Sequence, residues 1–314
     1  MKKFIIGVLL FLAPLLILDR IWFNVLSHFR PSDYKEFLDA KQSFFKGKSQ
    51  YDILIIGDSH IADAVDPNLI EEKTGYTGFN LGVYHSTPFE NYYIAKNALK
   101  NLQKPPKYII LGTNPVMFKR GTSVGRYTPI IINDKMGLIM NSDEGIDAQV
   151  FFPSIREKYL INSIIGKLRG KEYKPTRVIE KSKNGFLTFF NQKPLVQWKS
   201  SNTEEIVGKE INESQLEYFI KTIQIAKAQN IQIYIVHTPI WREQLNTLNQ
   251  TDHFKTFVST IDSIAQEYQV KVIYKYINND ANDSYNQSEY LDPQPLNYNG
   301  AKKFTQYLIT EIFN

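Results

Sequence analysis

The sequence predicts an α/β protein built as a three-layer α/β/α sandwich around a doubly wound parallel sheet. Short apolar runs rich in Ile, Val and Tyr alternate with helix-length segments, which is the pattern of parallel βαβ units. The predicted strands are residues 51–56, 78–81, 108–112, 231–237 and 270–276. The predicted helices are residues 67–74, 88–102, 213–229, 253–268 and 299–313. Together they form one domain over residues 51–314.

One segment interrupts this alternation. Residues from about 117 to 212 contain turns with Gly and Asn, a short helical pattern and aromatic-rich pieces, without a regular strand–helix repeat. The segment is too long for a simple loop in a compact domain. We therefore expect an insertion or cap beside the active face of the sheet.

The N-terminus predicts a membrane anchor. Lys2 and Lys3 precede a mostly apolar, uncharged run from Phe4 to Leu18, and a second apolar stretch follows Asp19-Arg20. A basic start before such a run is typical of a signal sequence or an N-terminal anchor, and the lack of small residues at a cleavage position favours the uncleaved anchor. We predict an anchor over residues 1–27 and a linker with a first helix over residues 28–50. The body would then lie outside the cytoplasm, attached to the inner (cytoplasmic) membrane by a single pass.

The composition excludes several classes of function. The 37 Lys and Arg residues against 32 Asp and Glu give a net charge of +5, spread along the chain, whereas a nucleic-acid-binding protein would show a concentrated basic patch. Cysteine is absent, which excludes disulfides, thiolate metal sites and a lipid anchor on cysteine. Histidines and carboxylates lack the spacing of a metal site, so we expect neither a metal nor another cofactor.

Polar residues follow the predicted strands at their carboxyl ends, where open α/β sheets bind ligands. Asp58 and Ser59 come after the first strand, and Ser and Asp often accept hydrogen bonds from the first amides of a helix. The alternative is that Ser59 is a nucleophile at a strand-to-helix turn. The blocks at the strand ends are Gly57-Asp58-Ser59-His60, Asn80-Leu81-Gly82, Gly112-Thr113-Asn114, Val236-His237 and, before the last helix, a stretch that begins at Asp292.

In their order and placement these blocks resemble the SGNH (GDSL) hydrolase superfamily over roughly residues 50–314. Gly57-Asp58-Ser59 resembles its first block, Gly82 the glycine of its second, and Gly112-Thr113-Asn114 the Gly-x-Asn of its third. The resemblance implies a flavodoxin-like sheet on which Ser59 attacks an acyl carbonyl. It also implies that the amides of Ser59 and Gly82, with the side chain of Asn114, stabilise the developing oxyanion. Asp292 would orient a histidine.

The resemblance extends to one branch of the superfamily. The predicted anchor, the Gly-Asp-Ser-His form of the first block and the ending Asp-x-x-x-Leu-Asn-x-x-Gly-Ala look most like the membrane-anchored branch. That branch includes the D-alanyl-lipoteichoic acid biosynthesis protein and the alginate O-acetylation proteins. The resemblance implies three partners: the membrane, a cell-envelope glycan or acyl ester, and an integral-membrane acyltransferase.

The last block departs from the family pattern. Where the family has Asp-x-x-His, this chain has Asp292-Pro293-Gln294-Pro295, which keeps the carboxylate and lacks the imidazole. A serine hydroxyl is a poor nucleophile unless a neighbouring group removes its proton. His237, at the end of the fourth predicted strand, is the preferred substitute base because it lies at the same sheet edge as Ser59. His85 is less favoured, and on a helix the side chain of His60 should point about 100° away from that of Ser59. Each histidine could instead be a hydrogen-bonded partner in a polar cleft.

Two classes of function therefore stay open. In the first, the protein is a membrane-anchored serine acyl esterase or acyltransferase that acts on cell-envelope glycan or lipid through Ser59 and a relocated base. In the second, it is a catalytically impaired SGNH scaffold that binds a glycan, an acyl chain or a membrane partner. A third alternative is that Pro295 is a variant of an otherwise active protein.

Overall fold

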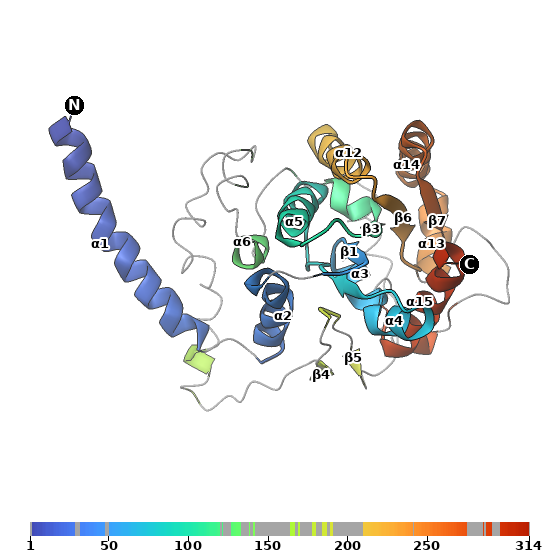
Figure 1. Cartoon of the computed structure of the whole chain (residues 1–314), viewed down its shortest axis with the longest axis horizontal. Helices are drawn as coiled ribbons and strands as arrows, with labels where there is room; N and C mark the ends of the chain where they lie inside the picture. The colour runs from blue at the N-terminus through green and yellow to red at the C-terminus, as the bar shows by residue number, and fades with distance from the viewer. Residues whose placement is uncertain are drawn as a thin grey trace.

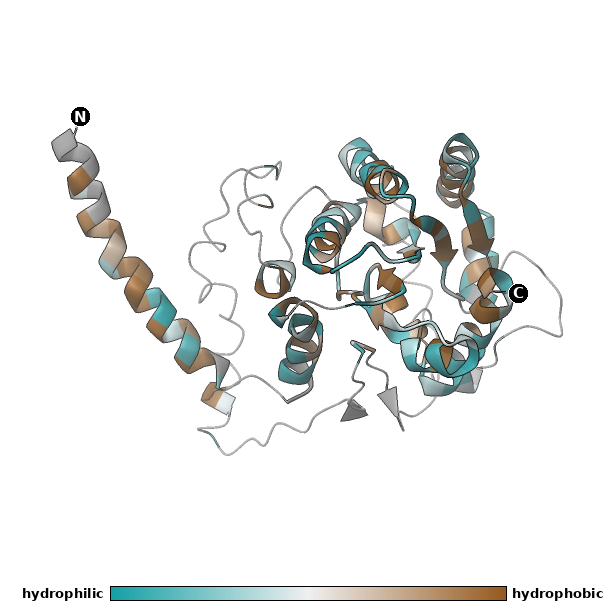
Figure 2. Cartoon of the chain, in the orientation of Figure 1, coloured by the Kyte–Doolittle hydropathy of each residue, from teal (hydrophilic) through white to brown (hydrophobic). Residues whose placement is uncertain are grey.

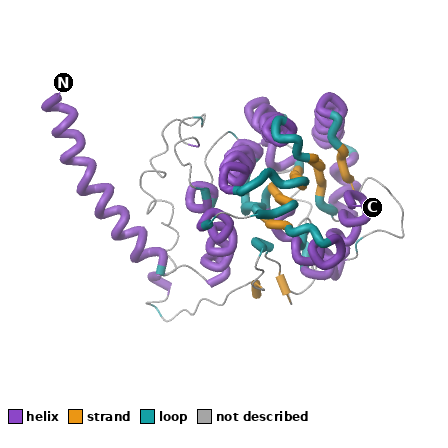
Figure 3. Tube along the Cα trace, viewed as in Figure 1, coloured by secondary structure: helices purple, strands orange, loops and turns teal. Residues whose placement is uncertain are grey.

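A computed structural model of the chain describes residues 2–28, 32–47, 50–119, 127–132, 210–240, 242–274, 287–290 and 296–313, together with short pieces and single positions between 121 and 190 and residue 285. Figure 1 shows these elements in chain order, and Figure 3 shows helices surrounding a central group of strands.

The centre of the domain is a five-stranded parallel sheet with the strand order β2-β1-β3-β6-β7. Every predicted strand is present, and the order is that of a doubly wound sheet whose first strand lies inside it. All four pairs of neighbouring strands are parallel, so the carboxyl ends of the five strands share one edge of the sheet. The strands are β1 (Ile53–Ile56), β2 (Gly78–Asn80), β3 (Tyr108–Thr113), β6 (Gln232–His237) and β7 (Lys271–Tyr274).

Successive residues of the strands face opposite sides of the sheet, and both sides are buried. Leu54, Ile109 and Ile233 pack into one cluster with helices α5, α12 and α14, whereas Ile53 and Ile110 pack into a second cluster with α3, α4 and α15. The domain therefore has the three predicted layers, as Figure 1 shows. The helices are α3 (Ser59–Ala64), α4 (Pro67–Thr74), α5 (Pro88–Asn101), α12 (Glu213–Lys227), α13 (Arg242–Asn249), α14 (Asp252–Tyr268) and α15 (Tyr298–Phe313).

Local sequence signals explain where the helices start. Before α5, Thr87 accepts a hydrogen bond from the Glu90 amide while the Glu90 carboxylate accepts one from the Thr87 amide, which is a capping box with Pro88 at the first helical position. Before α4, Asp66 caps the helix, and Gly75 ends it with a φ of 75°. These signals agree with the predicted bounds of both helices.

The N-terminal part forms α1 (Lys2–Ser27) and α2 (Ser32–Ser43), followed by the short helix η1 (Phe44–Lys46). Figures 1 and 2 show α1 extending away from the domain, hydrophobic along most of its length. Large apolar side chains on α1 are open to the surroundings, with Leu10 71% and Phe11 69% exposed. Among the described residues, no helix combines the length and the apolar character that crossing a membrane requires.

The predicted insertion at about 117–212 falls mostly outside the described residues. Its described parts include η2 (Pro115–Lys119), α6 (Thr128–Ile131) and an antiparallel pair of short strands, β4 (Val178–Ile179) and β5 (Phe189–Phe190). The pair is separate from the central sheet.

Candidate active site

Ser59 is the first residue of α3 and follows β1 after a two-residue turn. Asp58 caps the helix, because its Oδ1 atom accepts a hydrogen bond from the His60 amide at 3.1 Å. Ser59 itself is half-buried, and α3 places it at the carboxyl edge of the sheet. Asp58 is therefore the helix cap, and Ser59 lies at the predicted strand-to-helix turn, where its role as a nucleophile stays a prediction.

The Asp58 carboxylate is the centre of a polar network. Its Oδ2 atom lies 2.8 Å from His60 Nδ1 and accepts a hydrogen bond from Asn114 Nδ2 at 2.6 Å. Asp58 is only 7% exposed. Burial alone would raise the pKa of this carboxyl, but the charge and hydrogen bond of His60 and the hydrogen bond from Asn114 outweigh it and hold the pKa below its usual value. Asp58 is therefore ionised at neutral pH.

An ionised Asp58 decides which nitrogen of His60 carries the proton. A carboxylate can only accept, so His60 Nδ1 donates to Asp58 Oδ2, and the second ring nitrogen, Nε2, is the basic position of the neutral ring. The separation of 3.2 Å between Asn114 Nδ2 and His60 Nδ1 is then a close contact between two donors. The side chain of His60 is 16% exposed, at the boundary between the domain and solvent.

Asn114 follows β3 directly and uses both ends of its side chain. Its Oδ1 atom accepts hydrogen bonds from the amides of Val116 at 2.9 Å and Met117 at 3.2 Å, which starts η2. Its Nδ2 atom donates to Asp58. Asn114 thus lies at the edge predicted for it and next to the turn that contains Ser59, with its amide turned toward Asp58. Its role toward an oxyanion stays a prediction.

Gly82 packs so closely against α3 that there is no room for a side chain at this position. A Cβ atom at this position would come within 2.8 Å of the Ala62 backbone, so close packing of the loop after β2 against α3 requires glycine. The Gly82 amide donates to Asn80 Oδ1 at 2.9 Å. The predicted role of this amide in an oxyanion hole therefore requires that it leave Asn80, and it stays a prediction.

Asn80 and the buried Lys41, neither of which was predicted to be a site residue, hold this loop in place through hydrogen bonds. Asn80 Nδ2 donates to carbonyl groups of α3 and, at the shortest distance of 2.9 Å, to the carbonyl of Val65, the residue that follows the helix. The buried Lys41 Nζ on α2 donates to the carbonyls of Asn80 at 2.8 Å and of Gly185 at 2.6 Å. Desolvation lowers the pKa of Lys41 from its ordinary value of 10.5 to about 7, although Asp63 nearby opposes the shift. No sequence signal separates Lys41 from the other lysines, because only the packing of α2 buries it.

His237, the predicted substitute base, ends β6 beside Thr113 at the expected edge. The residue is fully buried, and its ring lies edge-on to Phe257 with 5.6 Å between ring centres. Desolvation lowers the pKa of His237 to about 3, against the weaker opposing effect of its contact with the Thr238 carbonyl. A buried imidazole with so low a pKa is a weak proton acceptor. The arrangement therefore does not favour His237 as the base. His85 is exposed and has a φ of 61°.

Asp292 and Pro295 lie outside the described residues. The residues that flank them, Tyr290 and Leu296, are joined by an antiparallel bridge and belong to the same core cluster as Ile61 of α3. Further along, Thr305 on α15 donates to the carbonyl of Ala64 at 3.3 Å. The C-terminal segment thus packs against the helix that starts with Ser59.

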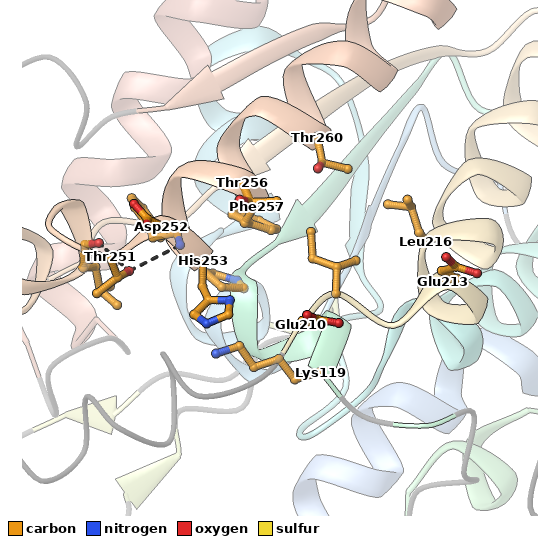
Figure 4. A pocket seen from close by; sticks show the side chains of 14 residues that line it. Lys119, Glu210, Glu213, Leu216, Thr251, Asp252, His253, Thr256, Phe257 and Thr260 are labelled. Carbon is orange, nitrogen blue, oxygen red and sulfur yellow. Dashed lines mark hydrogen bonds between the residues drawn. The ribbon is translucent and has the colours of Figure 1, made fainter.

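A cavity of about 460 Å³ lies next to Pro115, the residue after Asn114. Pro115 lines it, and Figure 4 shows Thr256, Phe257 and Thr260 of α14 opposite Leu216 of α12. Its remaining lining residues are Lys119, Glu210, Ile211, Glu213, Leu248, Thr251, Asp252, His253 and Phe254. The cavity therefore combines an apolar wall with a rim of charged and hydroxyl groups.

The sequence matches no protein-family model and no curated protein. Among solved structures, it is similar to an acetylxylan esterase from Geobacillus stearothermophilus, with 12% identity and a TM-score of 0.41 over 85% of this chain and 96% of that one. A GDSL-like lipase from Bacteroides thetaiotaomicron aligns with 10% identity and a TM-score of 0.39 over 83% of this chain and 87% of that one. A lipase/acylhydrolase from Enterococcus faecalis aligns with 10% identity and a TM-score of 0.37 over 83% and 94%. Similarity at this level does not bear on activity, and the proposed function rests on the residues of the site.

Proposed function

We propose that the protein is an SGNH-type serine acyl esterase or acyltransferase, with Ser59 as its nucleophile. The observation that carries the proposal is the placement of Ser59, Gly82 and Asn114 after three adjacent parallel strands, all in contact with the first turns of α3 or its cap. Each of these residue types stands where the resemblance to the superfamily expects it. The proposal extends to an acyl ester of a cell-envelope glycan or lipid as substrate.

Of the three groups proposed to bind the oxyanion, two already donate a hydrogen bond within the protein. The Ser59 amide is at the first position of a helix, where backbone amides have no partner within the helix. The Gly82 amide and the Asn114 side chain would exchange their hydrogen bonds to Asn80 and Asp58 for bonds to the oxyanion. The Gly82 amide would exchange a hydrogen bond to a neutral acceptor for one to a charged oxyanion, and a charge-assisted hydrogen bond is about twice as strong as a neutral one. This exchange therefore stabilises the charged intermediate more than the neutral substrate.

The cavity beside Pro115 supports a substrate with an apolar part. Its volume of about 460 Å³ lies within the range of about 300–1,000 Å³ that is usual for small-molecule sites. Its walls include Leu216 and Phe257, so an acyl chain or the apolar face of a sugar would be desolvated there. The proposal is that this part of the substrate binds in the cavity, which includes the residue after Asn114, while the reacting carbonyl lies at Ser59.

Membrane attachment through residues 1–27 is part of the same proposal. It is supported by the lysines at positions 2 and 3 before an apolar run, and by the exposure of apolar side chains on α1 such as Leu10 and Phe11. The domain would then act outside the cytoplasm on cell-envelope material, beside an integral-membrane acyltransferase partner that supplies or receives the acyl group.

One observation favours a second candidate function. Pro295 stands where the superfamily has its catalytic histidine, so a scaffold that binds a glycan, an acyl chain or a membrane partner without turnover fits the same fold. The two candidates differ in one property, which is whether Ser59 is a reactive nucleophile.

The test uses the full chain in detergent, with p-nitrophenyl acetate as substrate and a fluorophosphonate probe that reacts covalently with activated serines. Ser59→Ala should abolish labelling and lower kcat/KM by several orders of magnitude, as loss of a nucleophile does. The matched control is Ser259→Ala on the exposed face of α14, which should behave as the parent. A parent that neither reacts with the probe nor hydrolyses the ester would reject the enzyme in favour of the scaffold.

Membrane attachment has its own test. The full chain and a chain starting at residue 28, which keeps α2 and the buried Lys41, are expressed in bacteria, and the membranes are washed with carbonate. The full chain should stay in the membrane, and a protease added to intact spheroplasts should digest its body. Release of the full chain by carbonate, or a body protected from the protease, would contradict the proposed topology.

A further inference from the structure

The structure brings an imidazole and a carboxylate together one residue from the proposed nucleophile. We propose that His60, oriented by Asp58, is the general base of the Ser59 site and takes the role that Pro295 leaves without an imidazole. The inference rests on the proposed function, since a base is needed only if Ser59 reacts. His237, the histidine that the sequence favoured for this role, is fully buried.

The local geometry of the helix start builds this pair. Asp58 caps α3 with Oδ1 on the His60 amide and reaches the His60 ring with Oδ2, so two bonds from one carboxylate hold both the backbone and the side chain of the same residue. Asn114, from the end of β3, donates to the same Oδ2 atom. The two bonds from His60 hold the carboxylate in position even when Asn114 turns to the oxyanion, and the carboxylate orients the ring in turn.

When the ring is neutral, its contact with Asp58 keeps the proton on Nδ1 and places the lone pair on Nε2. Among the described residues, the groups beside His60 include the ionised Asp58 on its own turn and the uncharged Asn114 from β3, and the buried imidazole of His237 on β6 interacts with it electrostatically. Asp58 accepts the Nδ1 proton and stabilises the imidazolium once the ring has taken a second proton. The same division of roles operates in serine hydrolase triads, where the carboxylate orients the ring without taking its proton.

The proton would pass from Ser59 to His60 through one water molecule. Side chains of neighbouring helical residues diverge by about 100°, so a direct bond between Ser59 Oγ and His60 Nε2 is not expected, and a general base acts equally well through one bridging water. Nε2 takes a proton from that water as the water takes the Ser59 proton and Oγ bonds to the ester carbon. The imidazolium then returns the proton to the departing alkoxide, which leaves acyl-Ser59 and a free alcohol. In the second half, Nε2 removes a proton from water or an acceptor hydroxyl, which attacks acyl-Ser59 and regenerates the serine.

The experiment compares the pH dependence of p-nitrophenyl acetate hydrolysis in the full-length parent, His60→Gln, Ser59→Ala and a control, His28→Gln, whose histidine is exposed at the end of α1. His60→Gln should lower kcat/KM at neutral pH by about 10²–10⁴-fold, the usual contribution of a general base. In the parent, kcat/KM should level off once the imidazole is neutral. In His60→Gln it should keep rising about tenfold per pH unit, since hydroxide then replaces the missing base.

The pH profile separates a base from a merely structural histidine. If His60→Gln loses activity but keeps a parent-shaped profile, His60 only supports the fold and the inference is overturned. If His60→Gln stays within about threefold of the parent while Ser59→Ala is inactive, another group is the base, and the inference fails although the proposed function stands. If the parent shows no hydrolysis that depends on Ser59, the proposed function fails and the inference fails with it.

Discussion

His60 and His237 lie at the same edge of the sheet and have opposite environments. His60 is the second residue of α3, 16% exposed in its side chain, and its ring is 2.8 Å from a carboxylate. His237 is the last residue of β6, fully buried, with an aromatic ring as its neighbour. A strand residue that alternates into the core is covered by the helices of that face, whereas a residue in the first turn of a helix can remain at the rim. Position at the carboxyl edge is therefore necessary for a catalytic histidine but does not suffice.

The largest effect on activity is expected from a change that breaks the Asp58–His60 pair but keeps both the imidazole ring and the helix cap. Asp58→Asn keeps a side-chain oxygen for the His60 amide, and Asn caps helices about as well as Asp, so stability should change little. The variant does lose the negative charge of Asp58, which keeps the proton on His60 Nδ1. We expect kcat/KM for p-nitrophenyl acetate to fall by about 10³–10⁴-fold, the scale of the equivalent change in a serine protease.

The measurement pairs the hydrolysis assay with thermal unfolding of the same preparation. Activity near that of the parent in a folded Asp58→Asn variant would show that His60 does not depend on its carboxylate. The comparison between the two histidines would then lose its basis, since pairing with Asp58 is what distinguishes them.

A smaller effect, on stability alone, is expected at His237. Its pKa in the folded protein, about 3, lies below the ordinary value of 6.5, so between these values the unfolded chain binds more protons than the folded one. The contribution of His237 to the free energy of unfolding should therefore be fully present above pH 6.5 and decrease as the pH falls toward 3. His237→Phe should remove this contribution and leave kcat/KM within about twofold of the parent.

Urea unfolding of the parent and His237→Phe at neutral and at acidic pH measures the difference directly. As the pH falls, the free energy of unfolding should decrease more in the parent than in His237→Phe. A large loss of turnover in His237→Phe, with its fold intact, would mean that the buried ring takes part in the reaction and would reverse the assignment of the two histidines.

Much of the domain was predictable because its signals are local. The alternation of apolar runs and helix-length segments predicted all five strands, and the two helices predicted to start at residues 67 and 88 do start there, capped by Asp66 and Thr87. The alternation did not predict the order β2-β1-β3-β6-β7, which is one of the few that parallel crossovers allow. The insertion offered no comparable repeat, and Asp292 and Pro295 lie outside the described residues.

The sequence by itself determined the three-layer class, the strands, and which of them end in Ser59, Gly82 and Asn114, because hydrophobic period and turn chemistry are properties of neighbouring residues. Tertiary structure alone decided what each polar side chain meets. Burial of Lys41, the turn of the Asn114 amide toward Asp58 and the desolvation of His237 arise from elements far apart in the chain. The pairing of Asp58 with His60 is local, yet its importance appears only once His237 is covered by α14 and the helix start is left at the rim. Protonation and reactivity depend on desolvation and on the distance between charges, and both are set when the layers pack together.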